Sequence, residues 1–126
     1  MKILFLDDDI NRWDAFMERA IYNWLDENGI PPDLDWTQTA SETIQALKDK
    51  EYDAIFLDHD LGGKVMVKSG IGTGYEVAEW IAENLEEVPQ VILHSMNPVG
   101  VENMKSVLPT ADVVPFHILL QNLRSS

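Results

Sequence analysis

The sequence predicts an α/β fold in which one parallel sheet lies between two layers of helices. Short apolar runs alternate five times with longer segments whose apolar residues recur at helical spacing. Several of the runs are apolar throughout, as in strands that are buried on both faces. At 126 residues, with no linker or internal repeat, the chain is expected to form a single domain over residues 1–126.

Five runs predict the strands of this sheet. The predicted strands are residues 3–6, 34–38, 54–57, 91–93 and 113–114. Right-handed crossovers between successive parallel strands favour the order 2-1-3-4-5, which is that of flavodoxin-like folds. The expected architecture is therefore a flavodoxin-like (βα)5 three-layer sandwich.

Helix-start signals precede the first four helical segments. The predicted capping residues are Asp9, Thr39, Thr73 and Asn97. Thr39 with Glu42, and Thr73 with Glu76, have the spacing of capping boxes. In the first helix apolar positions recur as far as Leu25, and Gly29 is expected to end it. Residues 117–123 predict a last helix that is shortened.

The composition narrows the classes of function. The formal charge is −13, from 22 acidic and 9 basic residues, so the surface repels phosphates and direct nucleic-acid binding is not expected. No apolar run approaches the ~18 residues of a membrane span, and no signal peptide follows Met1. Cysteine is absent, which excludes disulfides and thiol chemistry. We expect a cytoplasmic protein that does not contact membranes.

Acidic residues follow two strands at the edge of the sheet where such folds bind ligands. Asp7, Asp8 and Asp9 follow the first strand, and Asp58 and Asp60 follow the third, which is its neighbour in the predicted order. Helix capping explains one of these residues but not the whole group. Carboxylates that converge need a counter-charge, and hard oxygen ligands suit Mg²⁺ or Mn²⁺. The candidate metal ligands are Asp7, Asp8, Asp58 and Asp60.

Four further polar residues near this edge have two interpretations each. The Ser95 hydroxyl, after the fourth strand, is either a donor to a phosphoryl oxygen or an ordinary strand-end group. His94 should face the opposite side of the strand from Ser95, and His59 should face away from Asp58. Each is either a general acid–base or a buried histidine. His117 either reaches the site from beyond the fifth strand or lies in solvent.

The connection after Asp60 is long and rich in glycine, from residue 62 to residue 74. Two lysines lie in it, and it leads into a helix N-terminus, where anions are favoured. It lacks the Gly-Lys-Ser/Thr ending of a P-loop. It is interpreted as a lid for phosphate or substrate, with a plain surface loop as the alternative. The candidate residues are Gly62, Gly63, Lys64, Lys68, Thr73 and, from the next helix cap, Asn97.

These features together resemble the receiver domains of two-component response regulators over nearly the whole chain. Asp7 and Asp8 match the acidic pair that binds Mg²⁺ in receivers, and Asp58 matches the aspartate that accepts phosphate. Ser95 matches the Ser/Thr after the fourth strand, and Asp60 stands where a backbone carbonyl ligates the metal. The resemblance implies a Mg²⁺ site and a phosphate ligand.

One receiver residue is missing. Receivers carry a lysine before the proline that follows the fifth strand, whereas this chain has Val114-Pro115-Phe116. The motifs at residues 57–63 (LDHDLGG), 72–75 (GTGY) and 94–100 (HSMNPVG) resemble instead the divergent receivers proposed to process cyclic phosphates. That resemblance implies a small phosphate ester, such as a cyclic phosphate, as the ligand.

Three functions remain open from the sequence. The first is Mg²⁺-dependent binding or processing of a small phosphate ester, by a phosphoesterase whose candidate catalytic residues are Asp58, Ser95, His94 and His117. The second is a signalling receiver in which Asp58 is phosphorylated and a separate protein partner reads the change. The third is a non-catalytic interaction domain. The missing lysine counts against the second function, and the intact acidic cluster counts against the third.

Overall fold

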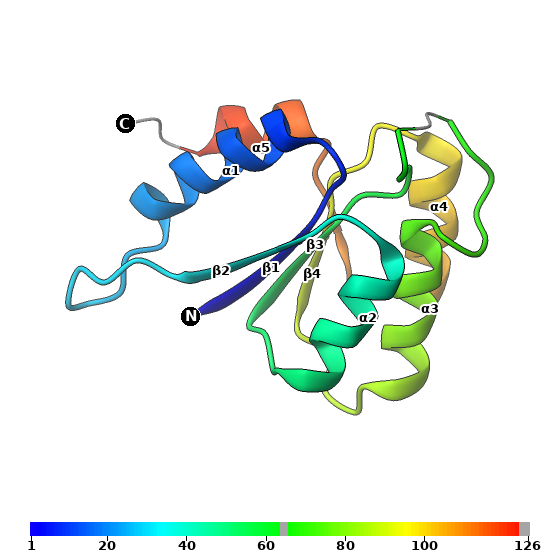
Figure 1. Ribbon diagram of the computed structural model, residues 1–126, viewed down its shortest axis with the longest axis horizontal. Coiled ribbons are helices and arrows are strands. Elements are labelled where there is room, and N and C mark those ends of the chain that lie inside the picture. The colour runs from blue at the N-terminus through cyan, green and yellow to red at the C-terminus, as the bar shows by residue number, and fades with distance from the viewer. Residues whose placement is uncertain (64–65, 124–126) are drawn as a thin grey trace.

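The computed structural model describes residues 1–63 and 66–123 and contains one five-stranded sheet (Figure 1). The strands are β1 (Lys2–Leu6), β2 (Asp33–Thr37), β3 (Ala54–Leu57), β4 (Gln90–Leu93) and β5 (Asp112–Val113). All neighbouring strands are parallel, in the order β2-β1-β3-β4-β5. The predicted flavodoxin-like order is confirmed.

Helices cover both faces of the sheet. They are α1 (Ile10–Asn23), α2 (Ala40–Asp49), α3 (Gly74–Asn84), α4 (Pro98–Val107) and α5 (Phe116–Asn122). Helices α1 and α5 lie on one face, and α2, α3 and α4 lie on the other (Figure 1). Helix α5 has only 7 residues, as the sequence predicted.

The alternation of strand residues decides which face each site residue joins. Toward α2, α3 and α4 the strands bury Leu4, Leu6, Ile55, Leu57 and Leu93. Toward α1 and α5 they bury Ile3, Phe5, Phe56 and Ile92. Because side chains alternate along a strand, the residue after each strand end continues the second set. Asp7, Asp58 and His94 are therefore directed toward the α1 face of the sheet.

Helix α1 ends earlier than the sequence predicted. Its last residue is Asn23, whereas the apolar pattern continued to Leu25 and the stop signal was Gly29. The Asp26 carboxylate accepts hydrogen bonds from the amides of Asn28 and Ile30, so the chain turns instead of continuing as a helix. Leu25 lies outside the helix and is 49% exposed.

The predicted capping box at Thr73 is wrong, although Thr73 is the N-cap residue of α3. Its hydroxyl donates to the Gly70 carbonyl at 2.7 Å and accepts from the Gly70 amide at 3.1 Å. The loop therefore closes on itself and satisfies the hydroxyl before the helix begins. At α2, by contrast, the Thr39 side chain does accept a helix amide.

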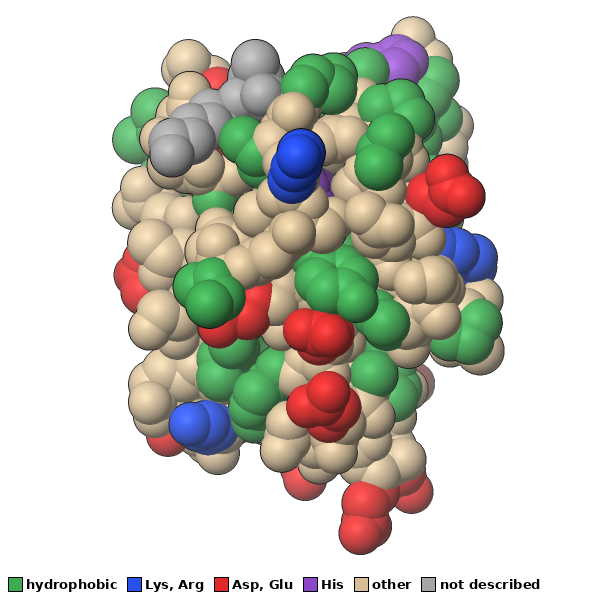
Figure 2. Space-filling view, turned by 90° about the vertical axis from the view of Figure 1, so that its right-hand side faces the viewer, with side chains coloured by type: hydrophobic (Ala, Val, Ile, Leu, Met, Phe, Trp, Pro, Cys, Tyr) green, Lys and Arg blue, Asp and Glu red, His purple; other side chains and the backbone are tan. Residues whose placement is uncertain are grey.

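The surface seen over the side that carries α3 and α4 shows more acidic than basic side chains (Figure 2). This agrees with the formal charge of −13. None of the helices in the part of the chain that the structure describes combines the length and apolarity that crossing a membrane requires.

Candidate functional site

Three buried side chains meet where β1, β3 and β4 end. Asp7, Asp58 and His94 each offer a ligand atom within 4.8 Å of the others, and their residues are 0%, 6% and 1% exposed. From the sequence, His94 was either a general acid–base or a buried histidine on the side of the strand opposite Ser95. Because Asp7 and Asp58 lie on the same face of the sheet, His94 reaches them.

His94 is held by Asp7 and by an aromatic ring. Its Nε2 lies 3.0 Å from Asp7 Oδ2, and its ring stacks on Phe5 with centroids 4.8 Å apart. Among the described residues, Nδ1 of His94 has no hydrogen-bond partner. A proton on Nδ1 would therefore be buried without an acceptor, which favours the tautomer in which Nε2 donates to Asp7.

Arg12, which was not among the predicted site residues, supplies the counter-charge of the cluster. Its Nε and Nη2 donate to the two carboxylate oxygens of Asp7, both at 2.8 Å. Nη2 also lies 3.5 Å from Asp58 Oδ2 and 3.6 Å from Asp8 Oδ1. The residue sits in the first turn of α1, where helical side chains lean back toward the N-terminus and hence over the strand end.

The two buried carboxylates differ in their pKa. Burial alone would raise the pKa of Asp7, but hydrogen bonds from His94 and Arg12 bring it below the ordinary value. Asp58 has no such pair of donors, and burial raises the pKa of Asp58 to about 6. In the metal-free protein the surrounding donors therefore compensate the negative charge of Asp7 well and that of Asp58 poorly.

All the acceptor positions of Asp7 are filled. Oδ1 accepts from the Asp9 amide at 2.9 Å as well as from Arg12, and Oδ2 accepts from Arg12 and His94. The Asp7 carbonyl accepts from Trp36 Nε1 at 2.7 Å. The predicted helix cap Asp9 accepts from the Asn11 and Arg12 amides, which fixes the start of α1 beside the cluster.

A cavity of about 490 Å³ opens above this cluster. Its lining includes Asp8, Arg12, Asp58, Asp60 and Ser95. The Ser95 hydroxyl accepts from the Asn97 amide at 3.1 Å, and its own proton stays available to a ligand oxygen. Predicted metal, phosphate and strand-end residues are thus brought to one cavity.

The donor set fits a hard divalent cation. Three carboxylates surround Nη2 of Arg12, and two of them, Asp8 and Asp58, line the cavity. Like charges packed this closely stabilise a cation that can bind oxygen ligands directly. Mg²⁺ or Mn²⁺ would be held by Asp8 and Asp58, with Asp7 close behind them.

Asp60, the fourth predicted metal ligand, turns its side chain to the loop instead. Its Oδ2 accepts from the Met66 amide at 2.6 Å, and its Oδ1 accepts from Asn97 Nδ2 at 3.0 Å. His59 Nδ1 lies 2.8 Å from the same Oδ1. A metal-binding role for Asp60 would thus involve its backbone carbonyl, as the receiver resemblance implied.

His59 anchors the long loop on the other face of the sheet. Its Nε2 lies 2.8 Å from Ser69 Oγ, and the ring is 0% exposed, as expected for a side chain that faces away from Asp58. A Cβ at Gly100 would lie 2.4 Å from the ring, so only glycine fits beneath it. We call His59, Asp60, Ser69 and Asn97 the loop clamp.

The clamp has the order of a Ser–His–Asp relay, but its geometry is that of a structural network. The Ser69 hydroxyl accepts from Asn103 Nδ2 at 2.9 Å while it bonds His59. The imidazole is fully buried, and none of Ser69, His59 and Asn103 borders the cavity. The arrangement pins residues 66–70 rather than exposing a nucleophile.

Asn97 was predicted to contact substrate, but it connects the clamp to α4. It accepts from the Gly100 amide at 3.0 Å and donates to Asp60 and to the Val67 carbonyl, both at 3.0 Å. It is 4% exposed. Its amide is therefore occupied by the protein.

Replacing Asn97 by alanine should lower the free energy of unfolding by about 2 kcal/mol, because a helix cap and two partly buried hydrogen bonds are lost. Amide hydrogen exchange should accelerate at Met66 and its neighbours, while the strands stay protected. Urea unfolding and exchange mass spectrometry measure both effects. Asn84→Ala is the control, since Asn84 is exposed and bonds only within α3. Equal effects of both substitutions would contradict the clamp.

The remaining predicted loop residues contribute little to the cavity. The Gly63 amide donates to Asp8 Oδ2 at 2.6 Å, so it orients that carboxylate. Gly62 has a φ of 74°, which glycine adopts readily. Outside the cavity lining lie Gly62, Lys68, Thr73 and His117, and all but Thr73 are exposed. Lys64 lies outside the described residues.

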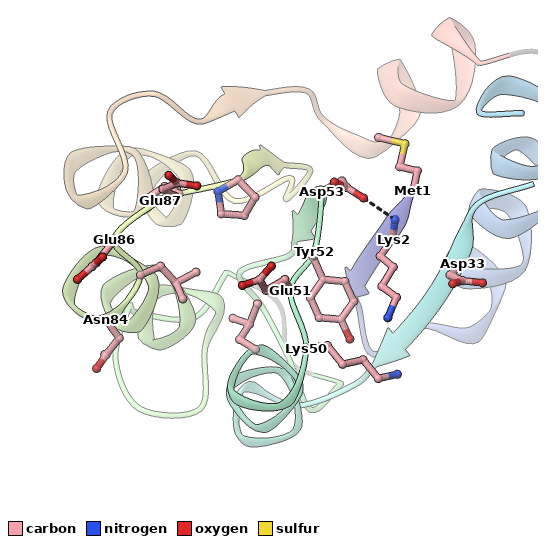
Figure 3. A pocket seen from close by; sticks show the side chains of 14 residues that line it. Met1, Lys2, Asp33, Lys50, Glu51, Tyr52, Asp53, Asn84, Glu86 and Glu87 are labelled. Carbon is pink, nitrogen blue, oxygen red and sulfur yellow. Dashed lines mark hydrogen bonds between the residues drawn. The ribbon is translucent and has the colours of Figure 1, made fainter. Parts of the chain in front are cut away.

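A second hollow, of about 880 Å³, lies at the amino ends of the strands (Figure 3). Lys50 and Tyr52 on its wall both bond Asp35 Oδ2, at 3.1 and 2.5 Å. Charges of both signs line it without converging on one point, as the labelled side chains show (Figure 3). The smaller cavity, which holds the buried cluster, is therefore the candidate site.

The sheet order and the acidic cluster beyond β1 and β3 define a receiver-type domain. The chain belongs to the family described as the cyclic-phosphate processing receiver domain, whose model matches residues 2–110. The matched region ends just before β5, after which receivers carry the lysine that is Val114 here. No curated protein is significantly similar to the chain.

Solved structures share the fold at low identity. The receiver domain of the stress response regulator RcsB from Escherichia coli has a TM-score of 0.70 and 12% identity over 97% of this chain and 86% of its own. The receiver domain of an HD domain-containing protein from Pseudomonas fluorescens Pf-5 has a TM-score of 0.69 and 14% identity, over 95% of this chain and 88% of its own. The Thermotoga maritima regulator TrrA, in complex with Mg²⁺ and BeF, has a TM-score of 0.62 and 23% identity, over 90% of this chain and 84% of its own.

Proposed function

We propose that this domain binds and processes a small phosphate ester, such as a cyclic phosphate, with the help of Mg²⁺ or Mn²⁺. The observation that carries the proposal is the convergence of Asp7, Asp8 and Asp58 on one cation position beside an open cavity. Membership of a receiver family described by cyclic-phosphate processing supports the ligand class.

Each residue has a distinct part in this proposal. Asp8 and Asp58 hold the metal, which when bound neutralises phosphoryl oxygens. Ser95 donates its hydroxyl proton to a phosphoryl oxygen at the cavity wall. His94 lines the cavity and keeps Asp7 in place through Nε2, so its part is that of a positioning residue. His117, exposed and outside the cavity lining, has no part in it.

Phosphorus NMR with Mg²⁺ and a 2′,3′-cyclic nucleotide tests the activity. The wild-type protein should convert the cyclic ester to a ring-opened monoester, and Asp58→Asn should lower the rate by roughly a hundredfold or more, because the metal loses a ligand. Asp112→Asn, which removes an exposed carboxylate of β5, should leave the rate unchanged. An intact cyclic ester after prolonged incubation with wild type would reject processing of this ester.

Asp58 phosphorylation is the second candidate function. The nearest charged donor to Asp58 Oδ2 among the described residues is Arg12 Nη2, at 3.5 Å, and Asp58 lines the cavity together with Ser95, as a phosphate-accepting carboxylate requires. This oxygen would attack phosphorus, the donor's leaving group would depart with its electron pair, and an acyl phosphate would remain. With acetyl phosphate and Mg²⁺, a phosphate-sized mass increase that Asp58→Asn abolishes would establish this function.

Two further properties belong to this proposal. We infer a cytoplasmic location from the lack of cysteine in the sequence. A phosphorylated Asp58 would be read by a partner domain or a partner protein.

A further inference from the structure

The position of Arg12 has a consequence for how the metal and the phosphate bind. One of its atoms, Nη2, contacts Asp7 at 2.8 Å, Asp58 at 3.5 Å and Asp8 at 3.6 Å. These are the three carboxylates of the proposed metal site. A positively charged group of the protein therefore already occupies the space in which the metal would bind.

Arg12 and a divalent cation cannot keep these positions together. A metal ion lies about 2.1 Å from its carboxylate oxygens, so it would approach the guanidinium within the contact distance of two like charges. The Arg12 side chain is 37% exposed and borders the cavity, which gives it room to leave. The buried Asp7 and His94 have no comparable freedom.

Among the described residues, Arg12 is the cavity's one lysine or arginine side chain that could bind a phosphate. The position after β5 that is a lysine in receivers is Val114, which does not line the cavity. Guanidinium groups bind phosphate oxygens with paired donors, so a displaced Arg12 has a suitable new partner within the same cavity.

We propose that Arg12 exchanges partners: it neutralises Asp7 in the empty site, and it moves to the phosphoryl group when a divalent metal and a phosphate ester bind together. The inference rests on the proposed function, because it requires the metal site. It predicts positive coupling between the two ligands. The metal alone must compete with Arg12, whereas phosphate gives the displaced guanidinium a favourable contact.

Manganese binding, measured from the electron paramagnetic resonance signal of free Mn²⁺, tests the exchange with and without inorganic phosphate. The wild-type protein should bind Mn²⁺ about tenfold more tightly when phosphate is present. Arg12→Gln should bind Mn²⁺ alone about tenfold more tightly than wild type, and phosphate should then have little effect. Arg12→Lys keeps a positive side chain that competes with Mn²⁺, so it should bind Mn²⁺ as weakly as wild type. It also provides a second test if Arg12→Gln fails to fold.

Arg19→Gln is the matched control, because Arg19 lies on the same helix, is half-buried and carries the same charge. Any general effect of a more negative protein should appear in both glutamine variants and can be subtracted. Equal Mn²⁺ affinity and equal phosphate enhancement in wild type, Arg12→Gln and Arg12→Lys would overturn the exchange while leaving the metal site intact. Absence of Mn²⁺ binding in every folded variant would overturn the proposed function itself.

Discussion

Replacing Asp58 by asparagine should stabilise the metal-free protein by about 3 kcal/mol near pH 8 and change its stability little near pH 4. Burial raises the pKa of Asp58 to about 6, from the ordinary 3.8. The folded protein therefore holds this proton more tightly than the unfolded chain does. Stability contributed by the protonated group is lost as the pH rises from about 4 to about 6. Asparagine has no charge to desolvate, so it avoids this loss.

Urea unfolding in a chelating buffer at several pH values measures this effect. The difference between Asp58→Asn and wild type should grow through the window from pH 4 to 6 and stay constant above it. Added Mg²⁺ should stabilise wild type and not the variant, which would close the gap. Asp112→Asn should show no such window, because Asp112 is exposed. A variant less stable than wild type near pH 8 would mean that Arg12 compensates for burial of the Asp58 charge.

Replacing Gly74 by alanine should lower the free energy of unfolding by about 3 kcal/mol or more and weaken metal binding. A Cβ at this position would lie 1.8 Å from the Asp58 carbonyl oxygen. The Gly74 amide also donates to the His59 carbonyl at 2.9 Å, so the start of α3 is fastened to the backbone that carries the site. The clash is with backbone, and its relief must displace Asp58.

Gly70→Ala is the control for this substitution, since no heavy atom lies within 4 Å of its Cβ position. Alanine is otherwise favoured over glycine in helices by up to about 1 kcal/mol, so a purely local view predicts stabilisation by Gly74→Ala. Thermal unfolding and Mn²⁺ titration of both variants distinguish the two views. A Gly74→Ala variant that matches wild type in thermal unfolding and in Mn²⁺ binding would show that α3 can shift away without moving Asp58.

The sheet order was predictable because the strands are short, apolar and regularly spaced between helices. The acidic cluster was predictable for the same reason, since neighbouring parallel strands deliver Asp7 and Asp58 to one edge. His94 was a candidate catalytic residue, and comparing the faces of all three strand ends would have placed it beside Asp7 and Asp58. This part of the site follows from strand geometry, which the sequence encodes well.

The contacts of side chains with loops were not predictable in this way. Arg12 reaches Asp7 because α1 begins at Ile10 and the side chain leans back over the strand, a direction that depends on where the helix starts. The Asp60 side chain bonds the Met66 amide, and Asn97 bonds the Val67 carbonyl. Both contacts depend on the path of the long loop, which the sequence does not specify. The one available signal was an arginine three residues after an aspartate triplet, in the first turn of the predicted helix.

The packing of His59 on Gly100 links the evolution of two distant positions. Since a Cβ at residue 100 would meet the imidazole ring, Gly100 cannot be replaced while His59 is present. A lineage can acquire a larger residue at position 100 only after a smaller one has replaced His59, and that first step gives up the anchor of the loop. Within the family, we expect every chain that has histidine at the first position to have glycine at the second, whereas only chains without that histidine can carry a larger residue there.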